Sequence, residues 1–165
     1  MCIRDSSGTV LVTAGDVPLL DAHTLRALLH DHRSSSETVA VSVLTFVPAE
    51  PNGYGRIVRD AQGRVAEIVE HADATPEQLR INEVNSGVYA FDAQTLMGAL
   101  AELSPDNAQH ELYLTDVIEI ANRRSKVVRA KHIDDAALVA GCNDRLQLST
   151  LGAELNRRIL ARHML

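Results

Sequence analysis

The sequence predicts an α/β protein whose partly parallel sheet carries an inserted β-hairpin and is followed by a long C-terminal helix. Short apolar runs rich in β-branched residues alternate with amphipathic runs along the 165 residues, which is typical of this class. Hydrophobic residues make up 45% of the chain, whereas aromatic residues make up only 3% and tryptophan is absent. Valine, leucine, isoleucine and alanine must therefore form most of the core.

The first third of the chain predicts two strands and one helix. Residues 9–14 are apolar on both faces and predict a buried parallel strand. Asp21 is placed to cap a helix over residues 21–33. Residues 38–47 are the longest β-rich run and predict a central strand. The side chains expected to face the core from the helix are those of Leu25, Leu28 and Leu29.

The middle of the chain predicts a β-hairpin. Residues 48–56 contain two prolines and two glycines, which marks a loop. Residues 55–71 alternate apolar and polar side chains around a turn at 60–63, which predicts two paired strands. The later expected elements are a loop with one helical turn (72–83), a strand (84–92), a helix capped by Asp92 and extending to Leu103, a helix (112–124), a strand (126–133) and a helix of about 20 residues within 142–165.

Composition and charge argue against several classes of protein. A formal net charge of −6 is unsuited to a general nucleic-acid-binding protein, which needs a surplus of lysine and arginine. No apolar run approaches the ~20 residues of a membrane span. Cys2 and Cys142 match neither a disulfide framework nor a zinc site, which fits a reduced, cytoplasmic setting. The seven histidines show no metal-ligand spacing, and we expect His30 and His32 on an exposed helix end.

The first eight residues differ in character from the rest of the chain. Residues 1–8 have no apolar segment of the kind that a signal peptide requires. The first predicted strand comes directly after them, without any preceding helix or loop. We therefore expect residues 1–8 to be a non-native leader joined to an interior piece of a longer chain.

Asp16 is the first candidate for chemistry because it follows an apolar strand directly. Ligands of open α/β sheets bind beyond the carboxyl ends of the strands, and a carboxylate there suits Mg²⁺. Gly15 would let a ligand approach the backbone closely. The alternative interpretation is that Asp16 begins an ordinary turn before Pro18.

Four further positions are open to two interpretations each. Gly55 could offer its N–H group to a ligand, with Tyr54 packing against a ligand ring, or it could serve an ordinary loop. Glu70 ends a predicted strand and could accept hydrogen bonds from sugar hydroxyls, or it could be a solvated strand end. Asn85, within an apolar strand, could bind a polar ligand or satisfy a bulge at the following Ser-Gly pair. Asn143 could complete a Mg²⁺ shell or cap the last helix.

Taken together, these segments resemble one known family. "GDVPLL", "NGYGRIVRD", "EIVEHADATPEQ", "EVNSGVYAFD", "NAQHELYLTDVI" and "GCNDRLQL" occur in one order and at one set of spacings. They are similar to the uridyltransferase domain of the bacterial bifunctional N-acetylglucosamine-1-phosphate uridyltransferase/glucosamine-1-phosphate acetyltransferases. The resemblance implies a partial Rossmann-like nucleotide-diphospho-sugar transferase sheet. Residues 9–142 would be the C-terminal part of that domain and residues 143–165 a linker helix.

The resemblance also implies roles for the candidate residues. Asp16 and Asn143 would be the catalytic pair that binds Mg²⁺ and contacts the sugar nucleotide. Gly55, Glu70 and Asn85 would hold the N-acetylglucosamine group, and Ala14 and Gly15 would border the nucleotide. Ala14, Cys142 and Asp144 depart slightly from the family pattern, in which a larger residue, a valine and an asparagine are common at these positions. These departures leave the metal pair intact.

The implied reaction joins UTP and N-acetylglucosamine 1-phosphate to give UDP-N-acetylglucosamine and pyrophosphate, a step towards peptidoglycan and the cell wall. The family's Gly-rich phosphate loop does not occur in these 165 residues, so we expect the chain alone to be inactive. Two alternatives remain: a non-catalytic sugar-nucleotide-binding module, and a nucleotidyltransferase for a different sugar. The resemblance further implies a cytoplasmic protein whose full-length form is a homotrimer, with no nucleic-acid or membrane partner.

Overall fold

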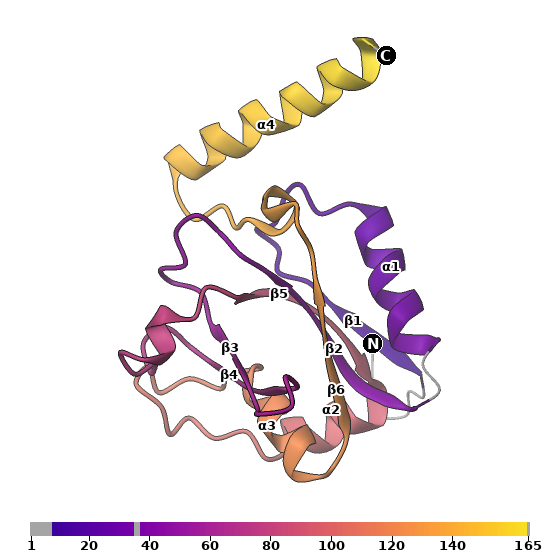
Figure 1. Ribbon diagram of the computed structural model, residues 1–165, viewed down its shortest axis with the longest axis vertical. Helices are drawn as coiled ribbons and strands as arrows, with labels where there is room; N and C mark the ends of the chain where they lie inside the picture. Colours follow the sequence, from indigo (N-terminus) through magenta and orange to yellow (C-terminus); the bar gives the residue numbers. More distant parts are fainter. Residues whose placement is uncertain (1–7, 35–36, 165) are drawn as a thin grey trace.

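The computed structural model describes residues 8–34 and 37–164, in which six strands form a single sheet (Figure 1). The strand order is β4-β3-β5-β2-β6, and β1 pairs with β5 beside this path. The expected leader falls largely on residues 1–7, which lie outside the described residues. The strands are β1 (Thr9–Val12), β2 (Val39–Phe46), β3 (Arg56–Arg59), β4 (Val65–Val69), β5 (Val84–Asp92) and β6 (Val127–His132). The helices are α1 (Ala22–Arg33), α2 (Ala93–Leu100), α3 (Asp116–Arg123) and α4 (Arg145–Met164), with short 3₁₀ turns η2 (Gln78–Arg80) and η3 (Ala136–Val139).

Two apolar clusters cover the opposite faces of this sheet. Alternate side chains of β2 and β5 point to opposite faces, so each strand contributes to both clusters. One cluster includes Val43 and Phe91 and packs under α2 and α3. The other includes Leu44 and Val88 and packs under α1 and η3. The α/β fold expected from the alternating pattern is confirmed.

The central strand and the hairpin are also as predicted. All eight residues of β2 are buried, and β2 pairs with β5 on one side and β6 on the other. β3 and β4 pair in antiparallel register around Gly63, whose φ of +78° lies in the left-handed region that the turn requires. Asp21 and Asp92 cap α1 and α2, accepting hydrogen bonds from the N–H groups of Thr24 (2.7 Å) and Thr95 (2.8 Å).

The prediction of a buried parallel strand at residues 9–14 was wrong in direction and burial. β1 pairs antiparallel with β5, and all four of its residues are only half-buried. Apolar composition does not reveal which strand becomes the neighbour, and that neighbour runs the opposite way. Since β1 and β2 are both antiparallel to β5, and β6 is parallel to β2, the strands β1, β2 and β6 point in one direction. Their carboxyl ends therefore meet at one edge of the sheet.

The prediction that His32 lies on an exposed helix end was wrong. It is 6% exposed, and its Nδ1 lies 3.0 Å from the Ser42 hydroxyl oxygen, so it is not on an exposed surface. It follows Leu28 by four positions and therefore shares the inward face of α1. His30, by contrast, is exposed as expected.

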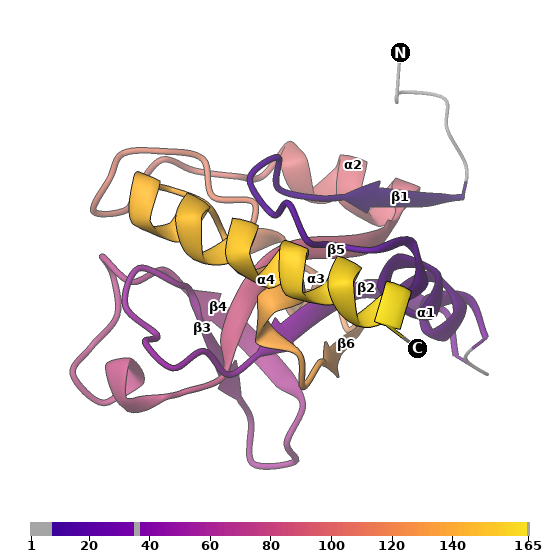
Figure 2. The same ribbon diagram turned by 90° about the horizontal axis from the view of Figure 1, so that it is seen from above.

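Helix boundaries differ from expectation at two places. α2 ends at Leu100, so Leu103 packs on the core from the loop beyond it. α3 begins only at Asp116, so residues 112–115 form the end of that loop. α4 lies apart from the sheet in Figure 1 and passes over the other elements in the view from above in Figure 2. Leu151 is its one buried residue within the described part of the chain. None of the described helices is both long and apolar enough to cross a membrane.

Candidate functional site

The predicted site residues lie at the sheet edge where β1, β2 and β6 end and β5 begins. Asp16 follows β1, whereas Asn85 is the second residue of β5, which runs the opposite way. Gly55 immediately precedes β3, and Glu70 immediately follows β4. The strand directions thus carry residues from distant parts of the sequence to one place.

Asp16 and Asn143 border the same small space. The Cys142 N–H group donates a hydrogen bond of 2.9 Å to the Asp16 carbonyl oxygen, which ties the end of β1 to the segment before α4. A Cβ built on Gly141 would lie 3.4 Å from Asp16 Oδ2 and 3.4 Å from Asn143 Nδ2. Glycine at position 141 therefore leaves open the space between the two side chains.

The alternative in which Asn143 caps α4 does not fit this geometry. The Gln147 N–H group donates to Asp144 Oδ1 at 2.7 Å, so Asp144 performs the capping. Gln147 Oε1 in turn accepts from the Asn143 N–H group at 2.6 Å. The Asn143 side chain is not used to start the helix, and rotation of its amide by half a turn would present the oxygen to the same space as Asp16.

The chemistry of this pair suits Mg²⁺ better than a transition metal. One carboxylate and one amide oxygen are hard ligands, and Mg²⁺ takes few protein ligands while retaining water or phosphate oxygens. Within residues 8–34 and 37–164, no cluster of three or more His, Cys, Asp or Glu side chains could hold a metal ion. Asp16 and Asn143 are both exposed, so a phosphate group could reach them. The two side chains therefore fit a metal ion that is shared with a bound phosphate, and not one that is enclosed by protein.

Ala14 and Gly15 connect this pair to β5. The Ala14 Cβ atom lies 3.5 Å from where a Cβ would stand on Gly87, whose φ is +75°. Gly15 has no atom within 4 Å of its own Cβ position, so its outer side is open. The chain entering Asp16 thus passes beside the irregular start of β5.

Gly55, Glu70 and Asn85 form a second group. The Asn85 N–H group donates to the Gly55 carbonyl oxygen at 2.9 Å. A Cβ on Gly55 would lie 3.3 Å from Glu70 Oε2 and 3.0 Å from the Ile68 Cγ2 methyl. Gly55 is buried, and any larger residue there would press on the Glu70 carboxylate.

The Asn85 side chain bonds to the backbone of the Ser-Gly pair that follows it, as one of its two interpretations predicted. Its Oδ1 atom accepts a hydrogen bond of 2.9 Å from the Gly87 N–H group. The side chain also hydrogen-bonds with the Tyr89 hydroxyl, and burial raises the pKa of that phenol strongly. Since a Cβ on Gly87 would lie 3.5 Å from the Ala14 Cβ atom, the Asn85–Gly87 turn lies between the two groups of predicted residues.

Glu70 is held in a partly desolvated position. Burial raises the pKa of its carboxyl group, and the neighbouring carboxylates of Asp116 and Asp73 raise it further. A hydrogen bond of 3.0 Å from Thr115 Oγ1 to Glu70 Oε1 acts the other way and stabilises the ionised form. That bond occupies Oε1 and leaves Oε2, the oxygen nearest Gly55, for another donor.

Three residues around this second group were not predicted from the sequence. Arg56 is 1% exposed and donates hydrogen bonds to the carbonyl oxygens of Pro51 and Tyr54, so it anchors the loop that ends at Gly55. Thr115 and Asp73 contact Glu70 and the loop beside it. From the sequence, Arg56 looks like an ordinary strand residue and Thr115 like an ordinary helix cap. No sequence signal therefore marked them as part of the site.

Tyr54 packs within the protein. Its ring meets the Phe46 ring edge-on, with centroids 5.3 Å apart, and the residue is half-buried.

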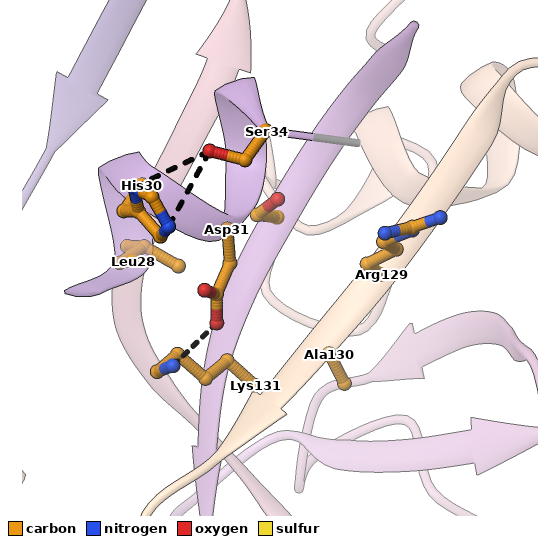
Figure 3. Close-up of a pocket in the computed structure, with 8 residues that line it drawn as sticks. Leu28, His30, Asp31, Ser34, Arg129, Ala130 and Lys131 are labelled. Carbon is orange, nitrogen blue, oxygen red and sulfur yellow. Dashed lines mark hydrogen bonds and ion pairs between the residues drawn. The ribbon is translucent and has the colours of Figure 1, made fainter. Parts of the chain in front are cut away.

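A separate pocket of 360 Å³ lies between α1 and β6 (Figure 3). Charged side chains line it, and Asp31 is ion-paired with Lys131 across it. None of the predicted site residues borders this pocket.

Comparison with known proteins agrees with the geometry. The sequence model described as "Nucleotidyl transferase" matches residues 1–136. The chain belongs to the nucleotidyl transferase family. It is 62% identical over 160 residues to the "Bifunctional protein GlmU" of Nocardia farcinica and 61% identical over 161 residues to that of Rhodococcus opacus. These matches cover 97% of this chain, which spans 32% of the length of each relative.

A solved structure gives the same fold for this nucleotidyl transferase chain. A crystal structure titled as a glucose-1-phosphate thymidylyltransferase from Bacillus anthracis, in complex with a sucrose, matches with a TM-score of 0.65. The match covers 90% of this chain and 55% of that protein, at 20% sequence identity. At that identity, the likeness supports the shared architecture and not the substrate. It agrees with the expected Rossmann-like transferase sheet.

Proposed function

We propose that this chain supplies the sugar side and the metal pair of an enzyme that makes UDP-N-acetylglucosamine and pyrophosphate from UTP and N-acetylglucosamine 1-phosphate. The identity of about 60% to two bifunctional relatives supports this assignment. The observation that carries it is the placement of Asp16 and Asn143 around Gly141, joined by the hydrogen bond from Cys142 to Asp16.

In this proposal, Asp16 and Asn143 would hold Mg²⁺. When bound, the ion would neutralise charge on the phosphate oxygens during transfer. The chain's own residues bind and orient. Glu70 Oε2 and the Asn85 side chain would accept and donate hydrogen bonds to sugar hydroxyls, and Gly55 would let the sugar approach the backbone. Little proton transfer is needed from side chains, because alignment of the two phosphates provides much of the rate enhancement.

A chimeric enzyme tests the proposal. Residues 9–164 would replace the matching segment of the Nocardia farcinica relative, and pyrophosphate release would be measured with UTP and several sugar 1-phosphates. We expect Mg²⁺-dependent release that prefers N-acetylglucosamine 1-phosphate and that Asp16→Asn lowers at least a hundredfold. The Asp144→Asn chimera is the matched control, because that carboxylate lies nearby but caps α4.

Two results would contradict the proposal. A folded chimera that binds UDP-N-acetylglucosamine but releases no pyrophosphate would indicate a non-catalytic binding module. A preference for dTTP and glucose 1-phosphate would indicate a different nucleotide and sugar. The homotrimer and the cytoplasmic location remain predictions from the family resemblance.

A further inference from the structure

The loop between α2 and α3 (residues 101–115) is fastened to the segment after β4 by two contacts of the Asp73 carboxylate. Asp73 Oδ1 accepts a hydrogen bond of 2.8 Å from the Ala108 N–H group. The phenol oxygen of Tyr113 lies 3.1 Å from Asp73 Oδ2. These contacts span 35 and 40 positions of sequence, so they fix how the loop lies on the hairpin.

The loop has an internal structure of its own. Asn107 Oδ1 accepts hydrogen bonds of 3.2 Å from the N–H groups of Gln109 and Glu111. His110 has a φ of +56°, in the left-handed region, which lets the chain turn back towards Asn107. Asp73 therefore holds a compact unit, and displacement at Ala108 would be passed on towards Tyr113 and α3.

Thr115 ends this loop and does not perform the usual task of its position. It occupies the N-cap of α3, yet its side chain makes no capping hydrogen bond. The hydroxyl instead donates to Glu70 Oε1, at a position where Thr115 is 4% exposed. α3 therefore lacks the stabilising side-chain hydrogen bond of an N-cap. The Thr115 hydroxyl instead binds one Glu70 oxygen, so the other oxygen faces Gly55.

We propose that Asp73 is a positioning residue for Glu70: it holds the α2–α3 loop so that Thr115 binds Oε1 and Oε2 stays turned towards the sugar. The proposal rests on the function proposed above, since it assigns Glu70 to the sugar. It adds a role for two residues that themselves contact no substrate. Without Asp73, the Thr115 hydroxyl is no longer fixed and the Glu70 carboxylate can rotate.

A purely electrostatic effect is the competing explanation. Glu70 and Asp73 line one cavity of 280 Å³ that is rich in carboxylates. The carboxylates of Asp116 and Asp73 both raise the pKa of Glu70, so removing either charge changes the field at Glu70. The other acidic residues lining the cavity are Glu67, Asp106, Asp116 and Glu119. Asp116→Asn is the matched control, because it removes the charge that acts more strongly on Glu70 and its side chain takes no part in the Ala108 and Tyr113 contacts.

Binding of UDP-N-acetylglucosamine to the 165-residue chain, in the presence of Mg²⁺, provides the first readout. We expect Asp73→Ala to weaken binding about fivefold, because it removes the acceptor for the Ala108 N–H group, and Thr115→Val about tenfold, because it removes the donor to Glu70. Thr115→Ser keeps a hydroxyl and should retain the affinity. Asp116→Asn should stay within about twofold of the unmodified chain. In the double variant, Asp73→Ala should add little to Thr115→Val, since both act through Glu70.

A second readout needs no ligand and separates failure of this inference from failure of the proposed function. We expect Asp73→Ala to raise amide hydrogen exchange in residues 104–115 about tenfold and to move the ¹³C shift of the Glu70 carboxyl, as Thr115→Val also does. The chimera described above decides the proposed function, and the exchange and shift data decide separately whether Asp73 positions Glu70. The inference is overturned if Asp116→Asn reproduces the effects of Asp73→Ala, or if Asp73→Ala leaves both exchange and the Glu70 shift unchanged.

Discussion

Gly55→Ala is the substitution whose consequence can be worked out most directly from the structure. The added methyl would stand 3.0 Å from Ile68 Cγ2 and 3.3 Å from Glu70 Oε2, closer than ordinary van der Waals contact. Ile68 is 5% exposed and cannot move away freely. Overpacking of this kind costs about 1–3 kcal/mol, and the loss of glycine's freedom in the unfolded chain returns about 0.4–1 kcal/mol. We therefore expect the free energy of unfolding to fall by about 1–2 kcal/mol.

Binding should also weaken, because the methyl occupies the space beside Oε2 of Glu70. Urea unfolding and calorimetric titration with UDP-N-acetylglucosamine measure the two effects, and we expect affinity to fall at least tenfold. Gly53→Ala is the matched control: its φ is +83° and nothing lies within 4 Å of its Cβ position. It should cost about 1 kcal/mol of strain and leave the affinity unchanged. A Gly55→Ala chain that bound the sugar nucleotide as tightly as the unmodified chain would refute this reasoning.

Three further predictions concern single side chains. Glu70→Gln should abolish sugar-nucleotide binding and raise the free energy of unfolding at pH 7. Burial raises the pKa of this carboxyl group, so its ionisation at pH 7 destabilises the folded chain, and glutamine removes that cost. A loss of stability in urea unfolding would contradict this. Burial lowers the pKa of His32, so the unfolded chain takes up a proton that the folded chain does not, and stability should fall as pH drops below about 6.5. His32→Asn should flatten the pH dependence of urea unfolding, and a pH dependence as steep as that of the unmodified chain would contradict this. Asp144→Ala should destabilise α4 by about 1 kcal/mol, seen as faster amide exchange in its first turn, whereas Asn143→Ala should leave that exchange unchanged.

Local rules predicted much of this fold. The caps at Asp21 and Asp92, the hairpin turn and the buried central strand each depend on a few neighbouring residues, and each was found where the sequence placed it. The position of Asp16 after an apolar strand was also local information. The sequence therefore placed the candidate carboxylate at the edge of the sheet.

Features that depend on distant partners could not be predicted in the same way. The direction of β1 is set by β5, which lies about 80 residues further along the chain. His32 is buried because its face of α1 meets Ser42, and a histidine among charged neighbours gives no sign of that. The role of Thr115 depends on Glu70, 45 positions away, and local rules describe it as an ordinary helix cap.

The most direct test of the central claim is the Mg²⁺ dependence of UDP-N-acetylglucosamine binding, measured by calorimetry on the unmodified chain and on Asp16→Asn. We predict that Mg²⁺ tightens binding to the unmodified chain at least tenfold and has no effect on the variant, because in the proposed function Asp16 and Asn143 would together hold the ion beside the phosphates. Binding that is equally tight with and without Mg²⁺, or that Asp16→Asn leaves equally sensitive to Mg²⁺, would contradict the assignment of this edge of the sheet as the metal-dependent sugar-nucleotide site.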